Sequence, residues 1–169
     1  MNNVEAIILA GGKSTRMGTD KGELLLGEKT LLEHVEGALA SAGLRVHLIE
    51  EDLVPACGPL SGIVTGFMIS DATRLLFLSC DMPFVKTETI SRLANSTDLL
   101  FAHSESGFGF PLVLTREEEP EVRSQIESGH RSIQALANRI NPTPFSPSNP
   151  DEFFNVNTPA DLDRARQLL

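Results

Sequence analysis

"VEAIILA", residues 4–10, runs directly into "GGKSTRMGTDK", residues 11–21, and this junction decides the fold. The first segment is mostly apolar, which is typical of a strand buried on both faces of a parallel sheet. The second segment is rich in glycine and in cations, and it follows the strand at once. Ligands of open α/β sheets bind at this end of the strands, so the junction predicts an α/β fold with a ligand site beside it.

The glycine loop matches neither of two common phosphate-binding motifs. A P-loop needs a glycine five positions before Gly12, where this chain has Ile7. The dinucleotide-binding fingerprint needs G-x-G-x-x-G spacing, which Gly11, Gly12 and Gly18 do not have. If the loop holds phosphate, it does so in a different arrangement.

Three cations of this loop suggest that it does hold phosphate. Lys13, Arg16 and Lys21 lie within nine residues of a chain whose net charge is −9. Gly11 and Gly12 let the backbone approach a ligand and expose N–H groups, which suit phosphate oxygens. The alternative is a tight turn between a strand and a helix, with solvated lysines.

Strand and helix patterns alternate along the rest of the chain. Helices are expected at 30–43, 59–70, 87–95, 117–140 (interrupted near 128–130) and 158–169, and strands at 44–51, 74–81, 98–103, 108–115 and 152–157. Thr30 and Glu33 form a predicted capping box, and Thr158 caps the closing helix. Pro111 places its strand at a sheet edge or a strand end. Residues 141–150 are rich in proline and read as a loop.

This alternation predicts a three-layer αβα sandwich around a mostly parallel sheet that includes an antiparallel strand. The 169 residues are expected to form a single domain, 1–169. The acidic net charge argues against a general surface for nucleic acid or for an anionic membrane. No apolar stretch is long enough to span a membrane, and no secretory signal is visible. Cys57 and Cys80 are the only cysteines, which predicts a reducing compartment and hence the cytoplasm.

Asp81 is the first candidate for a metal ligand. It ends the apolar segment 74–81, so it is expected at the edge of the sheet where ligands bind. A carboxylate at this place can hold Mg²⁺ beside a triphosphate. The alternative is a helix cap or turn residue ahead of Met82 and Pro83.

Asn155 and Asn157 are further polar candidates near the same edge. They alternate with Val156, so a strand would direct both amides to one face and the valine into the core. Two amides at one spot could bind a metal, a phosphate or a polar heterocycle. The alternative is a pair of turn-forming asparagines before a helix. Because ligands of open α/β sheets bind outside the carboxyl ends of the strands, the glycine loop, Asp81 and both asparagines should gather along one edge of the sheet.

The segment "CGPLSG", residues 57–62, predicts a turn that enters a helix with free N–H groups at its start. Gly58 and Gly62 allow a flat group to approach the backbone. Asp52 precedes this turn and could accept two hydrogen bonds from guanine, which offers an N–H and an NH₂. The alternative is a solvated acidic surface made by residues 50–52.

Four motifs taken in order, "LAGGKSTRMGTDK", "GPLSG", "CDMPF" and "NVNTPADL", resemble the molybdenum cofactor guanylyltransferases. This family belongs to the nucleotidyltransferase superfamily, which has a Rossmann-like fold. The resemblance implies a transferase that moves GMP from GTP to molybdopterin, releases pyrophosphate and takes part in molybdenum cofactor biosynthesis. Its partners would be GTP, molybdopterin (the Mo cofactor), and proteins of cofactor biosynthesis and molybdoenzyme maturation, with no nucleic acid and no membrane.

The resemblance also assigns roles to individual residues. Arg16, Lys21 and Asp81 would be catalytic, with Asp81 as the ligand of Mg²⁺, and Asn155 and Asn157 would lie on the molybdopterin side. The nucleotide would be bound by Leu9, Ala10, Gly11, Gly12, Lys13, Lys21, Asp52, Gly58 and Asp81. The terminal phosphate of molybdopterin would attack the α-phosphorus of GTP in line, without a protein nucleophile.

One departure from the family is a shortened segment between the first helix and "GPLSG". The family usually has a strand, a helix and another strand there, whereas only residues 44–57 span the gap in this chain. About one β-α unit is therefore expected to be absent. Two alternatives follow: another nucleotidyltransferase that uses CTP or a sugar phosphate, and a non-catalytic escort that binds nucleotide or cofactor.

Overall fold

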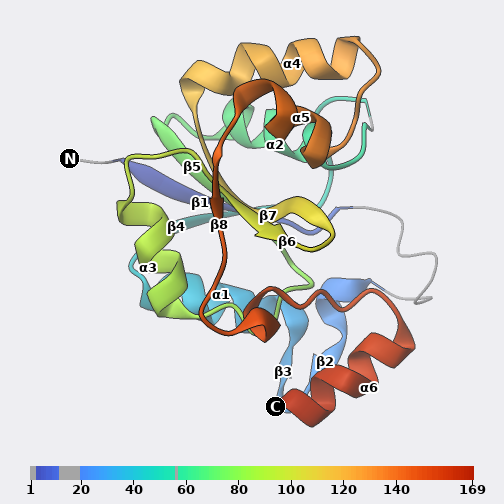
Figure 1. Ribbon diagram of the computed structural model, residues 1–169. Helices are drawn as coiled ribbons and strands as arrows, with labels where there is room; N and C mark the ends of the chain where they lie inside the picture. Colours follow the sequence, from blue (N-terminus) through green and yellow to red (C-terminus); the bar gives the residue numbers. More distant parts are fainter. Residues whose placement is uncertain (1–2, 12–19, 56) are drawn as a thin grey trace.

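The computed structural model describes residues 3–11, 20–55 and 57–169 (Figure 1). The chain folds into β1 (Val4–Leu9), η1 (Lys21–Glu23), β2 (Leu25–Leu26), β3 (Lys29–Thr30), α1 (Leu31–Ser41), β4 (Arg45–Ile49), α2 (Pro59–Ile69), β5 (Arg74–Ser79), α3 (Thr87–Asn95), β6 (Leu100–Ser104), β7 (Gly107–Thr115), η2 (Arg116–Glu118), α4 (Glu119–Glu127), α5 (Ile133–Ile140), β8 (Thr143–Phe145), η3 (Pro150–Phe153) and α6 (Pro159–Leu168). The η elements are short 3₁₀ helices.

Six strands form the central sheet, in the order β4-β1-β5-β7-β6-β8. β1 pairs in parallel with β4 and β5, and β6 pairs in parallel with β8, whereas β7 runs antiparallel to both of its neighbours. Helices α2, α4 and α5 cover one face, and α1 and α3 cover the other (Figure 1). The predicted three-layer α/β fold with one antiparallel strand is confirmed.

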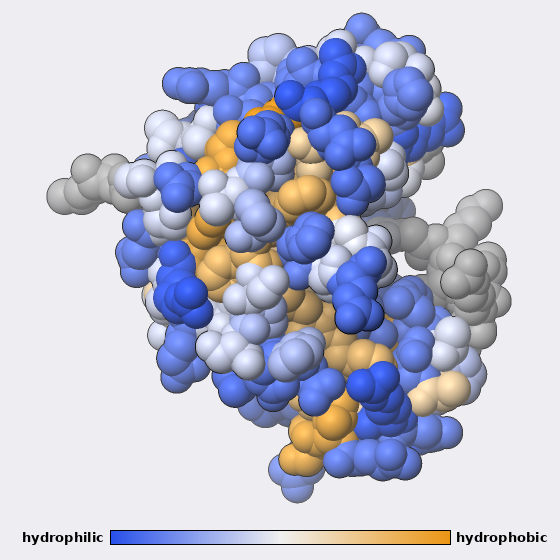
Figure 2. Space-filling view, viewed as in Figure 1, coloured by the Kyte–Doolittle hydropathy of each residue, from blue (hydrophilic) through white to orange (hydrophobic). Residues whose placement is uncertain are grey.

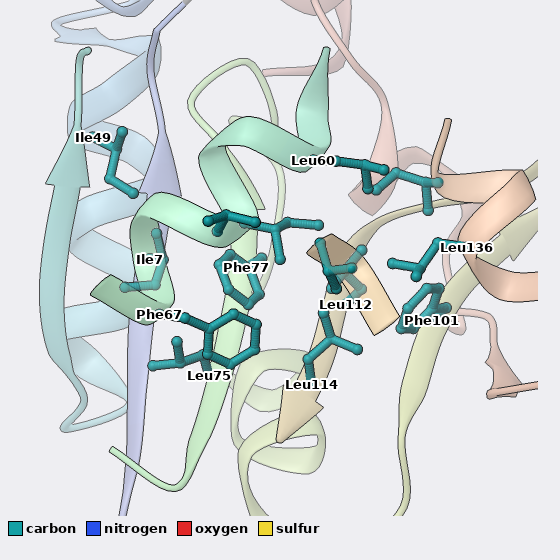
Figure 3. Close-up of a cluster of buried hydrophobic side chains, with 14 of the residues drawn as sticks. Ile7, Ile49, Leu60, Phe67, Leu75, Phe77, Phe101, Leu112, Leu114 and Leu136 are labelled. Atoms are coloured by element: carbon teal, nitrogen blue, oxygen red, sulfur yellow. The ribbon is translucent and has the colours of Figure 1, made fainter. Parts of the chain in front are cut away.

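The alternation of side chains along β1 divides the core between the two faces. Ile7 belongs to the cluster under α2, α4 and α5, whereas Ala6 and Ile8 belong to the cluster under α1 and α3. The rings of Phe77 from β5 and Phe67 from α2 meet edge to face in the first cluster, with centroids 5.8 Å apart (Figure 3). A strand buried on both faces therefore explains the nearly continuous apolar run of residues 4–10.

Glycine lets α2 lie close to the sheet. A Cβ added at Gly66 would lie 2.7 Å from Cε1 and 3.2 Å from Cζ of Phe77, and 3.3 Å from Cγ1 of Ile7. Real Cβ atoms do not come this near to a ring atom, so a larger residue would have to displace part of the core.

The helix ends follow the sequence signals closely. At α1, Glu33 N–H donates to Thr30 Oγ1 over 3.1 Å, and Thr30 N–H donates to Glu33 Oε2 over 2.7 Å, which is the predicted capping box. Gly43 follows the helix with φ of 73°. The closing helix has a second capping box, between Thr158 and Asp161.

Three details of the strands differ from the sequence-based prediction. Pro111 lies inside β7, a central strand, because the pairing of β6 with β7 shifts there: Phe101 pairs with Leu112, and Ala102 pairs with Gly109. The shift removes the need for a ladder N–H at the proline, as in a β-bulge. The predicted loop 141–150 contains the short strand β8. The predicted strand 152–157 is wrong: η3 occupies its start, and Val156 N–H donates to Asp81 O across 2.9 Å outside any ladder.

The chain passes from α1 through β4 alone into α2, and β4 forms an edge of the sheet. This path agrees with the expected absence of about one β-α unit. None of the helices in the described part of the chain is both long and apolar enough to cross a membrane. The face seen in Figure 2 is mostly hydrophilic at its periphery, whereas apolar surface runs across its middle and extends down toward the C-terminus, where Leu168 and Leu169 are exposed.

A buried carboxylate lies near the amino end of β1. Ser70 Oγ and His47 Nε2 both lie 2.6 Å from Oε2 of Glu5, and Arg45 Nη1 lies 3.5 Å from its Oε1. The hydrogen bond from Ser70 is the largest cause that lowers the pKa of Glu5, and the neighbouring His47 and Arg45 lower it further against the opposing effect of burial. This cluster therefore stabilises the fold through an ionised Glu5, at the C-terminal end of α2, where Ser70 is the cap residue.

Candidate active site

Lys21, Asp81 and Asn157 meet at the carboxyl edge of the sheet. The Lys21 ammonium donates to Asn157 Oδ1 across 2.7 Å and lies 3.5 Å from Oδ2 of Asp81. Lys21 starts η1, Asp81 follows β5, and Asn157 precedes α6, so three distant parts of the chain supply the cluster. The expected gathering of these residues along one edge is confirmed for this trio.

The backbone of Asp81 is hydrogen-bonded, whereas one of its carboxylate oxygens has no hydrogen-bond partner in the part of the chain that the structure describes. Its carbonyl accepts from Val156 N–H, and the residue is only 7% exposed. Its Oδ1 is buried and has no hydrogen-bond partner among the described residues. A buried carboxylate oxygen without a partner is costly unless a ligand satisfies it, so this oxygen fits a bound cation.

The described residues fit a divalent metal whose ligands come mostly from water and from substrate phosphates rather than from the protein. They contain no cluster of three or more histidine, cysteine or carboxylate side chains that could enclose a metal. Mg²⁺ commonly binds through one or two carboxylates and completes its shell with water and substrate phosphates. A single carboxylate such as that of Asp81 is compatible with a site of this kind.

Cys80 lies beside this cluster but is not a nucleophile. Burial, followed by the negative charges of Asp81 and Asp20, raises the pKa of the Cys80 thiol to about 12. The thiol therefore stays protonated near neutral pH. Cys57 and Cys80 are both free thiols.

A cavity of about 340 Å³ opens between the end of β1 and the start of α2. Its walls are Leu9, Gly11, Ile49, Asp52, Gly58, Pro59, Gly62, Ser79 and Phe110. Its size and the glycines in its wall suit a flat heterocycle. Leu9, Gly11, Asp52 and Gly58, all predicted to bind nucleotide, therefore lie together; we call this space the base cavity.

Several backbone groups expected to face a nucleotide are used within the protein. The N–H groups of Ala10 and Gly11 both donate to Ile49 O, across 2.8 and 3.0 Å. Leu9 O accepts from Cys80 N–H across 3.1 Å. A Cβ at Gly11 would lie 2.7 Å from Glu50 O, so a glycine is required here for close contact with the loop after β4. These bonds fix the rim of the base cavity.

A second cavity, of about 310 Å³, lies between the β6–β7 hairpin and the segment that leads into α6. Asn155 and Arg164 belong to its wall, and Arg164 lies over the ring of Phe154 with its Cζ 4.8 Å from the centroid. Phe110 belongs to the walls of both cavities. The two spaces are therefore neighbours that share one aromatic side chain; we call this one the hairpin cavity.

The two asparagines serve different places. Asn157 holds Lys21, whereas Asn155 lines the hairpin cavity and donates to Phe153 O. Val156 between them is fully buried, as predicted. Gly12, Lys13 and Arg16 lie outside the described residues, so their predicted roles stay predictions.

Sequence reasoning missed three residues that shape the site. Ser61 supports Asp52, Phe110 separates the cavities, and Arg164 lines the hairpin cavity. The first was visible inside the quoted "GPLSG" motif, as a hydroxyl in the first turn of a helix. The other two depend on a bulge and on the docking of α6, which have no local sequence signal.

Comparison with known proteins gives the family. Residues 6–142 match the family model of the MobA-like NTP transferase domain. The molybdenum cofactor guanylyltransferase of Vibrio campbellii is 30% identical over 185 residues, an alignment that covers 96% of this chain and 94% of the relative.

Solved structures show the same fold. A molybdopterin-guanine dinucleotide biosynthesis protein A from Archaeoglobus fulgidus matches with a TM-score of 0.73 at 23% identity, covering 97% of each chain. A Mycobacterium tuberculosis protein crystallised as a complex with manganese matches with a TM-score of 0.66 at 16% identity, covering 98% of each chain. The chain is thus a nucleotidyltransferase that belongs to the MobA-like NTP transferase family.

Proposed function

We propose that this protein transfers GMP from GTP to molybdopterin and releases pyrophosphate. The observation that carries the proposal is the meeting of Lys21, Asp81 and Asn157 at the sheet edge where β5 ends. Ser79, the last residue of β5, lies in the wall of a cavity sized for a nucleobase. An ammonium and an unpartnered buried carboxylate oxygen are the groups that a triphosphate and its metal need. The named relative from Vibrio campbellii supports guanine as the base and molybdopterin as the acceptor.

The proposed reaction is one displacement at the α-phosphorus. An oxygen of the molybdopterin phosphate forms the new bond, the bond between the α-phosphorus and the bridging oxygen breaks, and pyrophosphate carries the electron pair away. Such chemistry depends on positioning and on charge neutralisation, so it needs no protein nucleophile. The high pKa of Cys80, the nearest thiol to Asp81 in the chain, fits this scheme.

Lys21 would stabilise negative charge on the phosphates, and Asn157 would hold its ammonium in place. Asp81 would hold Mg²⁺, which supplies charge neutralisation to the phosphate oxygens when bound. Lys13 and Arg16, from the glycine loop, would add positive charge to the leaving pyrophosphate. Asn155 and the hairpin cavity would receive molybdopterin, because this space adjoins the base cavity at Phe110.

The decisive experiment mixes purified protein with Mg²⁺, molybdopterin (bare or carrying molybdenum) and one nucleotide at a time: GTP, CTP, ATP or UTP. We expect pyrophosphate release with GTP, and a product with the mass of the guanine dinucleotide. Product from CTP instead would support the related nucleotidyltransferase alternative. Tight GTP binding without product would support an escort that carries nucleotide or cofactor, the alternative motivated by the short segment between α1 and α2. The cytoplasm remains the proposed location, since both cysteines are free thiols.

A further inference from the structure

The base cavity has one charged wall residue among those that the structure describes, Asp52. Asp52 is exposed, and it follows β4 on a loop rather than on a rigid element. An exposed aspartate on a loop can turn its carboxylate into solvent, and ordering it on binding costs free energy. Something must therefore hold this carboxylate if it is to recognise a base.

Ser61 makes that contact. Its Oγ donates to Asp52 Oδ2 across 2.6 Å, and the residue is fully buried in the first turn of α2. Oγ also lies 2.8 Å from Gly58 O and accepts from Cys57 N–H across 3.4 Å. A hydroxyl has one proton, and the shorter distance to a charged acceptor assigns it to Asp52.

We infer that Ser61 is a positioning residue for guanine specificity: it fixes the Asp52 carboxylate at the wall of the base cavity. The inference rests on the proposed function and deepens it. Guanine presents an N1–H and a 2-amino group side by side, and a fixed carboxylate can accept from both. Hypoxanthine keeps only the N1–H, and adenine has an acceptor lone pair at N1, which the carboxylate repels.

Asp52 lies in the wall of the base cavity, and the hydrogen bond from Ser61 occupies only its Oδ2. A Cβ added at Gly62 would lie 3.5 Å from Asp52 Oδ1 and 2.8 Å from Leu9 Cδ2, so the hydrogen of glycine keeps this wall clear. Oδ2 carries the bond from Ser61 and retains capacity for a second donor. Both oxygens of Asp52 therefore have capacity to accept from a base while Ser61 donates to Oδ2.

The chain offers a matched control for the loss of this hydroxyl. Ser70, at the other end of α2, is also buried and also donates to a carboxylate oxygen across 2.6 Å, that of Glu5. Ser70→Ala thus removes the same chemistry from the same helix without touching the base cavity. If Ser61→Ala changes the preference for GTP over ITP and Ser70→Ala does not, the effect comes from the contact with Asp52 and not from the loss of a buried hydroxyl in general.

The test compares Ser61→Ala, Asp52→Ala, the double variant and Ser70→Ala, with GTP, ITP and ATP as substrates and by calorimetric binding of GTP and ITP. We expect Ser61→Ala to raise KM for GTP about tenfold, as for loss of one hydrogen bond to a charged group, while kcat changes little. The ratio of kcat/KM for GTP to that for ITP should fall toward the value of Asp52→Ala. The double variant should have the same kcat/KM for GTP as Asp52→Ala, because Ser61 acts only through Asp52.

The inference would be overturned by an unchanged GTP-to-ITP ratio of kcat/KM in Ser61→Ala, or by additive losses of kcat/KM in the double variant. An equal fall of the GTP-to-ITP ratio in the Ser70→Ala control would also overturn the inference. If wild-type protein transferred no nucleotide, the calorimetric ratio would still test Ser61, so failure of the proposed function is a separate result. If Ser61→Ala did not fold, Ser61→Cys would serve, because it nearly keeps the volume and weakens the donor.

Discussion

Replacing Gly66 by alanine should destabilise the protein, although alanine is the better helix former. The new Cβ would lie 2.7 Å from Cε1 of Phe77 and 3.3 Å from Cγ1 of Ile7. Both side chains are fully buried, and the ring also packs against Phe67, so neither can move without disturbing the core (Figure 3). Overpacking of this kind costs about 1–3 kcal/mol, against a gain of up to about 1 kcal/mol in helix propensity.

At Gly37 the same substitution should have the opposite effect on the free energy of unfolding. It lies within α1, is exposed, and an added Cβ would meet no atom within 4 Å. Gly37→Ala should therefore stabilise the protein by up to about 1 kcal/mol, and the two variants should differ by about 2 kcal/mol. For a chain of this length, each kcal/mol shifts Tm by about 2–4 °C.

Thermal unfolding followed by circular dichroism measures both variants under identical conditions. We expect Tm to fall for Gly66→Ala and to rise for Gly37→Ala. A Gly66→Ala protein as stable as Gly37→Ala would refute the reasoning, because it would show that α2 does not press on the Phe77 ring. GTP binding should weaken in Gly66→Ala only to the extent that α2 shifts away from the base cavity.

Three further predictions concern the active site and the buried carboxylate. Asp81→Ala should lower kcat about a hundredfold or more while thermal unfolding shows an intact fold; ordinary turnover would remove its assignment as metal ligand. Asn157→Ala should lower kcat about tenfold by removing one of the contacts that orient the Lys21 ammonium, and a purely structural asparagine would lower Tm instead. Because the pKa of Glu5 is lowered from 4.5, its stabilisation is present above that pH and is lost as pH falls through the folded pKa. Tm measured from pH 7 down to pH 3 should show this loss, and a smaller one in Ser70→Ala.

Much of the fold could be predicted because its signals are local. The apolar run of β1, the capping box of Thr30 and Glu33, and the cap at Thr158 each depend on neighbours within one helical turn or one strand. Their positions in the structure agree with the sequence within two or three residues. The single-domain expectation stays a prediction.

The strand expected at 152–157 failed for a reason that the local sequence does not contain. Its apolar and polar residues alternate, and Val156 does enter the core. Its backbone, however, bonds to Asp81 O rather than to a neighbouring strand. Alternation predicts which side chains are buried, whereas ladder formation depends on a partner strand that the chain brings from elsewhere.

The position of Asp81 could be predicted because it follows the end of a buried strand, and Lys21 is expected near it because the glycine loop leaves the same edge of the sheet. Ser61 could not be assigned a role in this way, because its partner, Asp52, lies nine residues earlier in a loop whose path the sequence does not fix. The bond depends on how that loop returns to the N-terminal end of α2. Leu53 N–H donates to Thr65 Oγ1 across 2.9 Å, and this second link helps to fix the loop beside the helix.

The bulge in β7 explains why Pro111 is tolerated in a central strand, and it also affects the shape of the site. A proline inside a central strand is tolerated only where the ladder is interrupted, and the register shift opposite Phe101 and Ala102 supplies that interruption. Bulges redirect neighbouring side chains, and the residue before this proline, Phe110, forms part of both cavities. The same irregularity that removes Pro111 from the ladder therefore places an aromatic wall between the proposed base and acceptor sites. It follows that a β7 with regular pairing would keep its strand but change the shape of both cavities at once.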